Sequence, residues 1–231
     1  MRQGQQTSVR ALFRAMRYPI AAVVFLGLGA CSSVPYSEQA ILPIRTAKSL
    51  HDVWDQNFRF FIGHPTLSAF SVCHNLSCTQ VSEVSLSEQQ WAPVRALFTP
   101  QAASAEAERQ QIQQAIALLE TVVGQQIGTT GDLARNQLQT SRYGQLDCID
   151  EATNTTVYLR LLESTGLLHW HQTSPMTSRG ILSGQAPHNT ATLIDTETHQ
   201  RYAVDAWFQD NGLPPAIIDL SVWRRGWQPG N

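Results

Sequence analysis

The sequence predicts an α+β fold in which N-terminal helices pack on a small antiparallel sheet. The middle of the chain repeats apolar residues at helical spacing, as at Ile112, Ile116 and Leu119. Further on, residues 188–195 and 201–208 have the pattern of two β-strands joined by a turn. Hydrophobic residues make up 42% and charged residues 15% of the 231 residues, which is a globular composition. The formal net charge of −2 comes without a basic patch, so we expect no nucleic-acid partner.

The N-terminal segment has the parts of a secretory signal. Four arginines precede the apolar run PIAAVVFLGLGA, whose 12 residues are too few to span a bilayer. The run leads into Leu28-Gly29-Ala30-Cys31, which resembles the bacterial lipobox. This resemblance implies removal of residues 1–30 and lipidation of Cys31, and Ser32 then favours the outer membrane, facing the periplasm. An ordinary cleaved signal, an uncleaved anchor and a start at Met16 are the alternatives.

The rest of the chain is expected to form one unit. No internal repeat or second boundary is visible, so residues 31–47 are interpreted as a lipidated tether and residues 48–231 as a single globular domain. Ser85 and Glu88 offer a capping box for a helix that contains Pro93. The other expected elements are a helix over 47–62, a strand over 79–86, helices from Ser104 to Gly124 and from Cys148 to Gly166, a strand within 167–173 and a short helix from Asp219 to Gly226.

The chain has four cysteines, and their positions suggest different uses. Cys73 and Cys78 lie close together in a turn-like stretch, so in an oxidising periplasm they read as a local disulfide. A metal clip with His74 and two free thiols are the alternatives. With Cys31 lipidated, Cys148 has no cysteine left to pair with. A single thiol in an oxidising compartment is a liability unless it is buried or used.

Cys148 lies where a helix is expected to begin. The free N–H groups and the positive end of the helix dipole favour an anion there, and a thiol in such a place can have its pKa lowered. The neighbouring Asp147, Asp150 and Glu151 would oppose a thiolate unless they point away or pair with arginines. The alternative interpretation of Cys148 is a small buried packing residue.

His188 and Asp205 are expected to meet across the predicted hairpin. They lie about ten and seven residues from a turn near residue 198, which makes them near neighbours on adjacent strands. A carboxylate beside an imidazole fixes the tautomer of the ring and stabilises the imidazolium. The pair therefore predicts a general base.

These three residues, in the order Cys148, His188, Asp205, resemble the transglutaminase-like, papain-related cysteine hydrolases. In that superfamily a cysteine opens a helix, and the histidine and aspartate come from consecutive strands. The matching context is Ala152, Leu161-Leu162 and Gly166-Leu167 on the helix and AVDAW around Asp205, within residues 131–208. The resemblance implies a papain-like core with Cys148, His188 and Asp205 as the catalytic residues.

The activity that this resemblance implies is thiol acyl transfer of the peptidase or amidase type, on peptide or peptidoglycan-stem amides, with no cofactor and no metal. Candidate donors for the oxyanion hole are Gln137, Gln139 and Gln145. Two other hypotheses stand beside it. One is a non-catalytic envelope binding or scaffold lipoprotein that retains the fold, and the other is a metal-binding protein that uses His169, His171 and His188.

Overall fold

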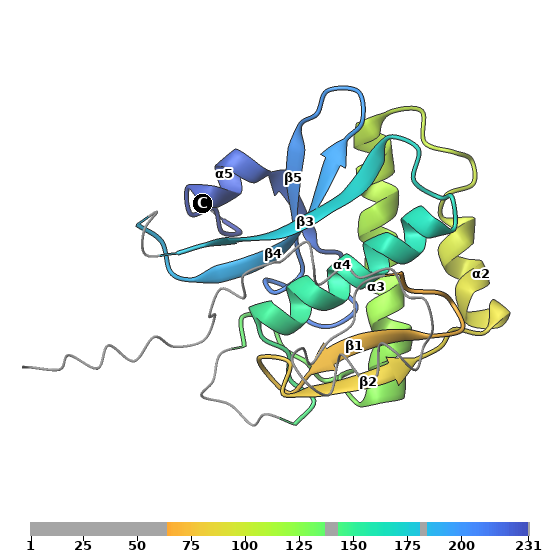
Figure 1. The fold of residues 1–231 in the computed structure, drawn as a ribbon, viewed down its shortest axis with the longest axis horizontal. Coiled ribbons are helices and arrows are strands. Elements are labelled where there is room, and N and C mark those ends of the chain that lie inside the picture. Colours follow the sequence, from red (N-terminus) through yellow and green to blue (C-terminus); the bar gives the residue numbers. More distant parts are fainter. Residues whose placement is uncertain (1–63, 137–142, 181–183, 231) are drawn as a thin grey trace, which may run out of the picture.

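The computed structural model describes residues 64–136, 143–180 and 184–230 (Figure 1). The predicted signal peptide (1–30), lipidated Cys31, tether (31–47) and helix over 47–62 lie outside the described residues. The described elements are β1 (Phe70–His74), β2 (Gln80–Val84), α2 (Glu88–Ala96), α3 (Ala105–Ile127), α4 (Cys148–Ser164), β3 (His171–Arg179), β4 (His188–Asp195), β5 (Arg201–Asp205), β6 (Ala216–Asp219) and α5 (Leu220–Arg224). None of these helices has the length and apolar character needed to cross a membrane.

The strands form two antiparallel sheets, so the α+β prediction is confirmed. β1 pairs with β2 as a hairpin, and β3-β4-β5-β6 form a four-stranded sheet in chain order. Figure 1 shows α4 between this sheet and the β1–β2 hairpin, with α5 on the other side of the sheet. Ala191 and Leu193 of β4 belong to the core that α3 and α4 share, whereas Ala203 of β5 packs against Leu220 and Trp223 of α5.

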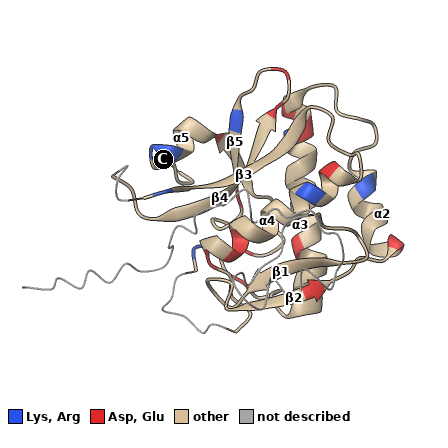
Figure 2. Ribbon diagram, viewed as in Figure 1, with Lys and Arg blue, Asp and Glu red and all other residues tan. Residues whose placement is uncertain are grey.

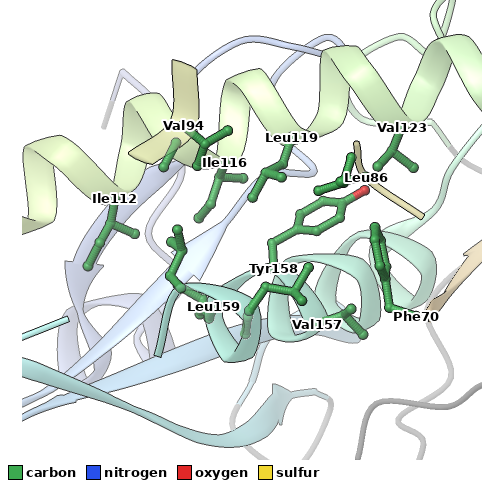
Figure 3. Packing of buried hydrophobic residues seen from close by; sticks show 14 of the residues in the cluster. Phe70, Leu86, Val94, Ile112, Ile116, Leu119, Val123, Val157, Tyr158 and Leu159 are labelled. Atoms are coloured by element: carbon green, nitrogen blue, oxygen red, sulfur yellow. The ribbon is translucent and has the colours of Figure 1, made fainter. Parts of the chain in front are cut away.

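The main core lies between α3 and α4 (Figure 3). Apolar side chains at helical spacing on α3 face α4, as the sequence predicts. Burying each such side chain stabilises the fold by ~1.5–3 kcal/mol. Phe70 of β1 joins them through an edge-to-face contact with Tyr158, with ring centroids 6.5 Å apart. The side chains labelled in Figure 3 that line this interface are Ile112, Ile116, Leu119 and Val123 of α3 and Val157, Tyr158 and Leu159 of α4.

Two predicted helix boundaries are wrong by a few residues. The capping box of α2 joins Ser87 and Gln90, not Ser85 and Glu88, because the helix begins two residues later than expected. α3 begins after Ser104 as predicted, but it runs past Gly124 to end at Gly128, whose φ of 81° suits glycine. A glycine within a helical run therefore did not stop this helix.

In the C-terminal half the predicted hairpin is present, whereas the strand expected within 167–173 is shifted to His171–Arg179. The hairpin over 188–195 and 201–208 is confirmed, although β5 ends at Asp205. β3 begins only at His171, because the Glu108 carboxylate accepts the backbone N–H groups of residues 169–171. The side chain of Asp219 caps α5 as expected.

Candidate active site

The start of α4 is built by two aspartates. Asp147 is the N-cap, and its Oδ1 accepts the backbone N–H groups of Ile149 and Asp150 at 2.9 and 3.1 Å. Asp150 returns the contact by accepting the N–H of Asp147 at 3.2 Å. This reciprocal capping fixes Cys148 as the first helical residue, which confirms its predicted position.

His188 and Asp205 form the predicted pair. His188 Nε2 lies 2.7 Å from Asp205 Oδ2, and both side chains are buried. The ladder places Ala191 opposite Val204, so Asp205 stands across from Thr190, two residues along β4 from His188. Residues two apart on a strand share a face, which is why the two side chains meet.

The second ring nitrogen of His188, Nδ1, differs from Nε2 in its surroundings. Nδ1 is buried and has no hydrogen-bond partner among the described residues. Because a carboxylate accepts at Nε2, the proton of the neutral ring is assigned to Nε2 and the lone pair to Nδ1. The ring is enclosed by Trp207, Phe208 and Trp223, with centroids 4.7, 5.3 and 5.6 Å away. The structure thus holds an oriented imidazole with one nitrogen ready to accept a proton.

Cys148 lies beside the start of β4. Asn189 Nδ2 is 3.9 Å from Cys148 Sγ, so the residue next to His188 touches the sulfur. Successive strand residues face opposite ways, and Asn189 shares the α4 side with Ala191, whereas His188 turns toward Trp223. The structure therefore brings Cys148 to within one residue of the base. Trp207 packs both on the His188 ring, with centroids 4.7 Å apart, and on the cluster that contains Cys148.

The prediction that Cys148 has no cysteine to pair with is wrong for this structure. Cys148 is disulfide-bonded, and its partner lies outside the described residues. Its side chain is 0% exposed and packs with Cys73, Cys78 and Ile149. Since a disulfide sulfur is not a thiolate, any nucleophilic chemistry at Cys148 belongs to the reduced protein.

The predicted disulfide between Cys73 and Cys78 is confirmed, with Cα atoms 4.7 Å apart. It spans the β1–β2 turn, in which residues 75–78 all have positive φ between 50° and 65°. Such left-handed geometry is costly for residues other than glycine, so outside contacts have to hold it. Those contacts come from α4: the N–H of Ser77 donates to Asp147 at 2.8 Å and the N–H of Cys78 donates to Asp150 at 2.7 Å.

The acidic residues around Cys148 neither point away nor pair with arginines. Figure 2 shows acidic residues at the first turn of α4, and the structure buries them. Burial raises the pKa of Asp150 well above its usual value, and the neighbouring Asp147 charge raises it further. Burial and the carboxylate of Glu120 likewise raise the pKa of Glu151. Both shifts favour the protonated form of these side chains, which opposes a build-up of negative charge beside Cys148.

The predicted donors of the oxyanion hole are three glutamines, of which the structure describes one. Gln137 and Gln139 lie outside the described residues. The Gln145 amide donates to the carbonyl of Gly131 at 3.0 Å, and its oxygen accepts from Asn136. Gln145 is therefore engaged in holding its own loop together.

The histidines proposed as a metal set do not converge. His171 stands opposite Asp195 at one end of the β3–β4 ladder, and His188 stands opposite Arg179 at the other, a separation of roughly 24 Å along the strand. His171 is held instead by Glu108 at Nδ1, 2.9 Å away. Among the described residues, the side chains close enough to share a cation are Cys73, Cys78 and Asp150, and the two sulfurs are already bonded to each other.

The chain matches no protein-family model, no curated protein and no solved structure. Two contacts at the site were missed at the sequence level: Asn189 on the Cys148 sulfur and the Trp223 indole on Asp205. The strand alternation that placed His188 could have indicated Asn189, whereas Trp223 carries no local signal. Chemically, the described residues provide a carboxylate-bound imidazole and, next to it on β4, a residue that contacts the Cys148 sulfur. An imidazole and a thiol are the groups needed for proton transfer to and from a nucleophilic cysteine.

Proposed function

We propose that Cys148, in its reduced form, is the nucleophile of a thiol acyl-transfer site within a papain-like, transglutaminase-like core. The observation that carries the proposal is the state of His188: Asp205 binds Nε2, and Nδ1 is buried with no hydrogen-bond partner among the described residues. A buried polar atom without a partner is costly, so an arrangement that keeps one needs a reason. A thiol proton arriving from Cys148 supplies that reason.

The reaction follows from these roles. His188 Nδ1 takes the proton of the Cys148 thiol, and the thiolate forms a C–S bond with an amide carbonyl carbon. When the C–N bond breaks, the His188 imidazolium gives the proton to the departing amine. Water or an amine then attacks the thioester, loses its proton to His188, and releases Cys148 again as a thiol. Asp205 orients the ring and offsets its positive charge while the proton is held.

The resemblance of the N-terminus to a lipoprotein signal supplies the setting. A lipidated Cys31 would hold the domain at the outer membrane, facing the periplasm. Because a sulfur that carries the lipid cannot also form a disulfide with Cys148, this setting belongs to the form of the protein in which Cys148 is reduced. The amides available there include peptides and the stem peptides of peptidoglycan, which we propose as the substrate class.

A non-catalytic envelope binding or scaffold module is the second candidate. It is favoured by the complete burial of Cys148 and by its disulfide bond, since both withhold the sulfur from a substrate. In that case the His188–Asp205 pair would serve only to satisfy buried polar groups.

Site-specific alkylation separates the two candidates. The full-length protein in detergent would be treated with a graded series of dithiothreitol concentrations and labelled with iodoacetamide between pH 5 and 9, and Cys148 labelling read by peptide mass spectrometry. We expect labelling of reduced Cys148 to persist below pH 7 and to revert to an ordinary thiol titration, near ~8.5, in His188→Ala. The exposed His169→Ala is the matched control and should leave the profile unchanged. Slow labelling that is indifferent to His188→Ala would establish a packed cysteine and the binding-module alternative.

A further inference from the structure

The Asp205 carboxylate has a second donor besides His188. The indole Nε1–H of Trp223 in α5 donates to Asp205 Oδ2 at 2.6 Å, the same oxygen that receives His188 Nε2 at 2.7 Å. A buried tryptophan N–H needs an acceptor, and a backbone carbonyl would satisfy it equally well. Here it converges with the imidazole on one carboxylate oxygen.

Trp223 is held rigidly in this position. It is 0% exposed, and the Arg179 guanidinium lies over its ring, 4.6 Å from the centroid. The same guanidinium donates to the backbone carbonyl of Trp223 at 2.5 Å and to that of Trp227 at 2.9 Å. Arg179 stands opposite His188 in the β3–β4 ladder, so one strand pair anchors both the histidine and the helix that carries the indole.

We propose that Trp223 is a positioning residue for the His188–Asp205 pair. This inference rests on the proposed function, because it assigns Trp223 a role in the same proton transfer. The indole fixes Asp205 Oδ2 in the plane where it binds Nε2, which leaves Nδ1 as the atom that takes the proton. It also shares the negative charge of the carboxylate, so it limits how strongly Asp205 retains a protonated ring.

The sign of the effect follows from that shared charge. Without the indole N–H, Asp205 concentrates its charge on His188 and holds the imidazolium more tightly. The other charged or titratable groups near the carboxylate are Arg179 from β3 and Glu151 from α4, and both are retained in a residue-223 variant. Arg179 also keeps its hydrogen bond to the backbone carbonyl of residue 223, although the ring beneath its guanidinium changes. The titration midpoint of His188 should therefore move to higher pH in Trp223→Phe, by about 0.5–1 pH unit.

The decisive experiment follows the His188 ring by ¹⁵N NMR against pH in the full-length protein in detergent. Trp223→Phe keeps an aromatic ring and removes the indole N–H together with one of the two indole rings. Trp227→Phe is the matched control, because Trp227 packs on Phe208 in the same C-terminal segment. We expect the midpoint to rise in Trp223→Phe and to stay at the wild-type value in Trp227→Phe. In the alkylation assay below pH 7, labelling of reduced Cys148 should rise about 3- to 10-fold in Trp223→Phe alone, because a more tightly held imidazolium favours the thiolate.

The outcomes separate the two proposals. A folded Trp223→Phe whose His188 midpoint equals that of wild type overturns the positioning role. Cys148 labelling in wild type that is independent of His188 overturns the proposed function instead, and the NMR midpoint still decides whether Trp223 governs His188. Should Trp223→Phe not fold, the wild-type indole N–H resonance serves: it should titrate with the His188 midpoint, and an indole signal that is constant through that range contradicts the inference.

Discussion

The two halves of α4 bury opposite kinds of side chain. The C-terminal half contributes Val157, Leu159 and Leu162 to the apolar interface with α3, where contact and burial suffice to explain every residue. The N-terminal half buries Asp147, Asp150 and Asn154 instead, against the disulfide-closed turn of the β1–β2 hairpin. It also buries Glu151, which faces Glu120 of α3. Buried polar groups cost free energy unless each is satisfied, so the polar half does something that packing alone does not require. The N-terminal half of α4 holds Cys148 at the start of the helix and fixes the turn between β1 and β2.

The largest effect is expected in the apolar half. Leu159→Ala removes a completely buried side chain and should lower the free energy of unfolding by about 2–5 kcal/mol, measured by urea denaturation. It should leave the dependence of Cys148 labelling on His188 intact, since it touches neither group. If Leu159→Ala had the stability of wild type, the C-terminal half of α4 would not stabilise the fold through apolar burial as described.

A substitution in the N-terminal, polar half of α4 should lower the stability less than Leu159→Ala does, but it should change the reactivity of Cys148 more. Asn154 spans the edge of β1, accepting the N–H of Cys73 at 2.7 Å and donating to its carbonyl at 2.8 Å. Asn154→Ala leaves both backbone groups buried without partners, so we expect a loss of about 1–3 kcal/mol together with altered Cys148 labelling. Thr156→Val is the matched control in the same helix, because its hydroxyl donates only to Ala152 one turn back. Equal losses of unfolding free energy in the two variants would argue against a special role for the contact between Asn154 and β1.

The sequence was informative where a residue acts through its neighbours along the chain. Periodicity located α3 and α4, alternation located β4 and β5, and counting from the turn brought His188 to Asp205. It was wrong where distant contacts decide. α3 continues through Gly124 to Ile127, and the Asn211 side chain packs where a Cβ of residue 124 would lie. Residues 169 and 170 lie outside the strand because the carboxylate of Glu108 on α3 accepts their N–H groups.

The site shows the same division. The order Cys148, His188, Asp205 could be read from the sequence, and so could the local disulfide. The indole on Asp205 could not, because Trp223 is 18 residues away along the chain and on a different element. Nor could the raised pKa values of Asp150 and Glu151 beside Cys148, which arise from burial and from neighbouring carboxylates.

The smallest predicted effect, counted per pH unit, concerns that buried charge. Glu120 of α3 accepts the N–H of Gly212 at 3.1 Å and faces Glu151 and Asp132, with Tyr158 close by. Burial raises the pKa of Glu120 from 4.5 to about 8. A carboxyl whose pKa is raised by folding keeps its proton in the folded protein when the unfolded chain has already released it. Its stabilising contribution is thus complete below pH 4.5 and is lost as the pH rises toward about 8.

Removing that titration should flatten the pH dependence of stability. Glu120→Gln keeps the shape of a protonated glutamate and cannot ionise, so the decline in unfolding free energy between pH 5 and 8 should shrink by about 1 kcal/mol per pH unit. Urea denaturation at four pH values measures the slope, and Glu106→Gln on the first turn of the same helix is the control. If the wild-type slope persists in Glu120→Gln, then Asp132, whose pKa burial raises to about 6, and Glu151 carry the proton instead. The proton that lowers the negative charge near the start of α4 would then not be carried by Glu120 of α3.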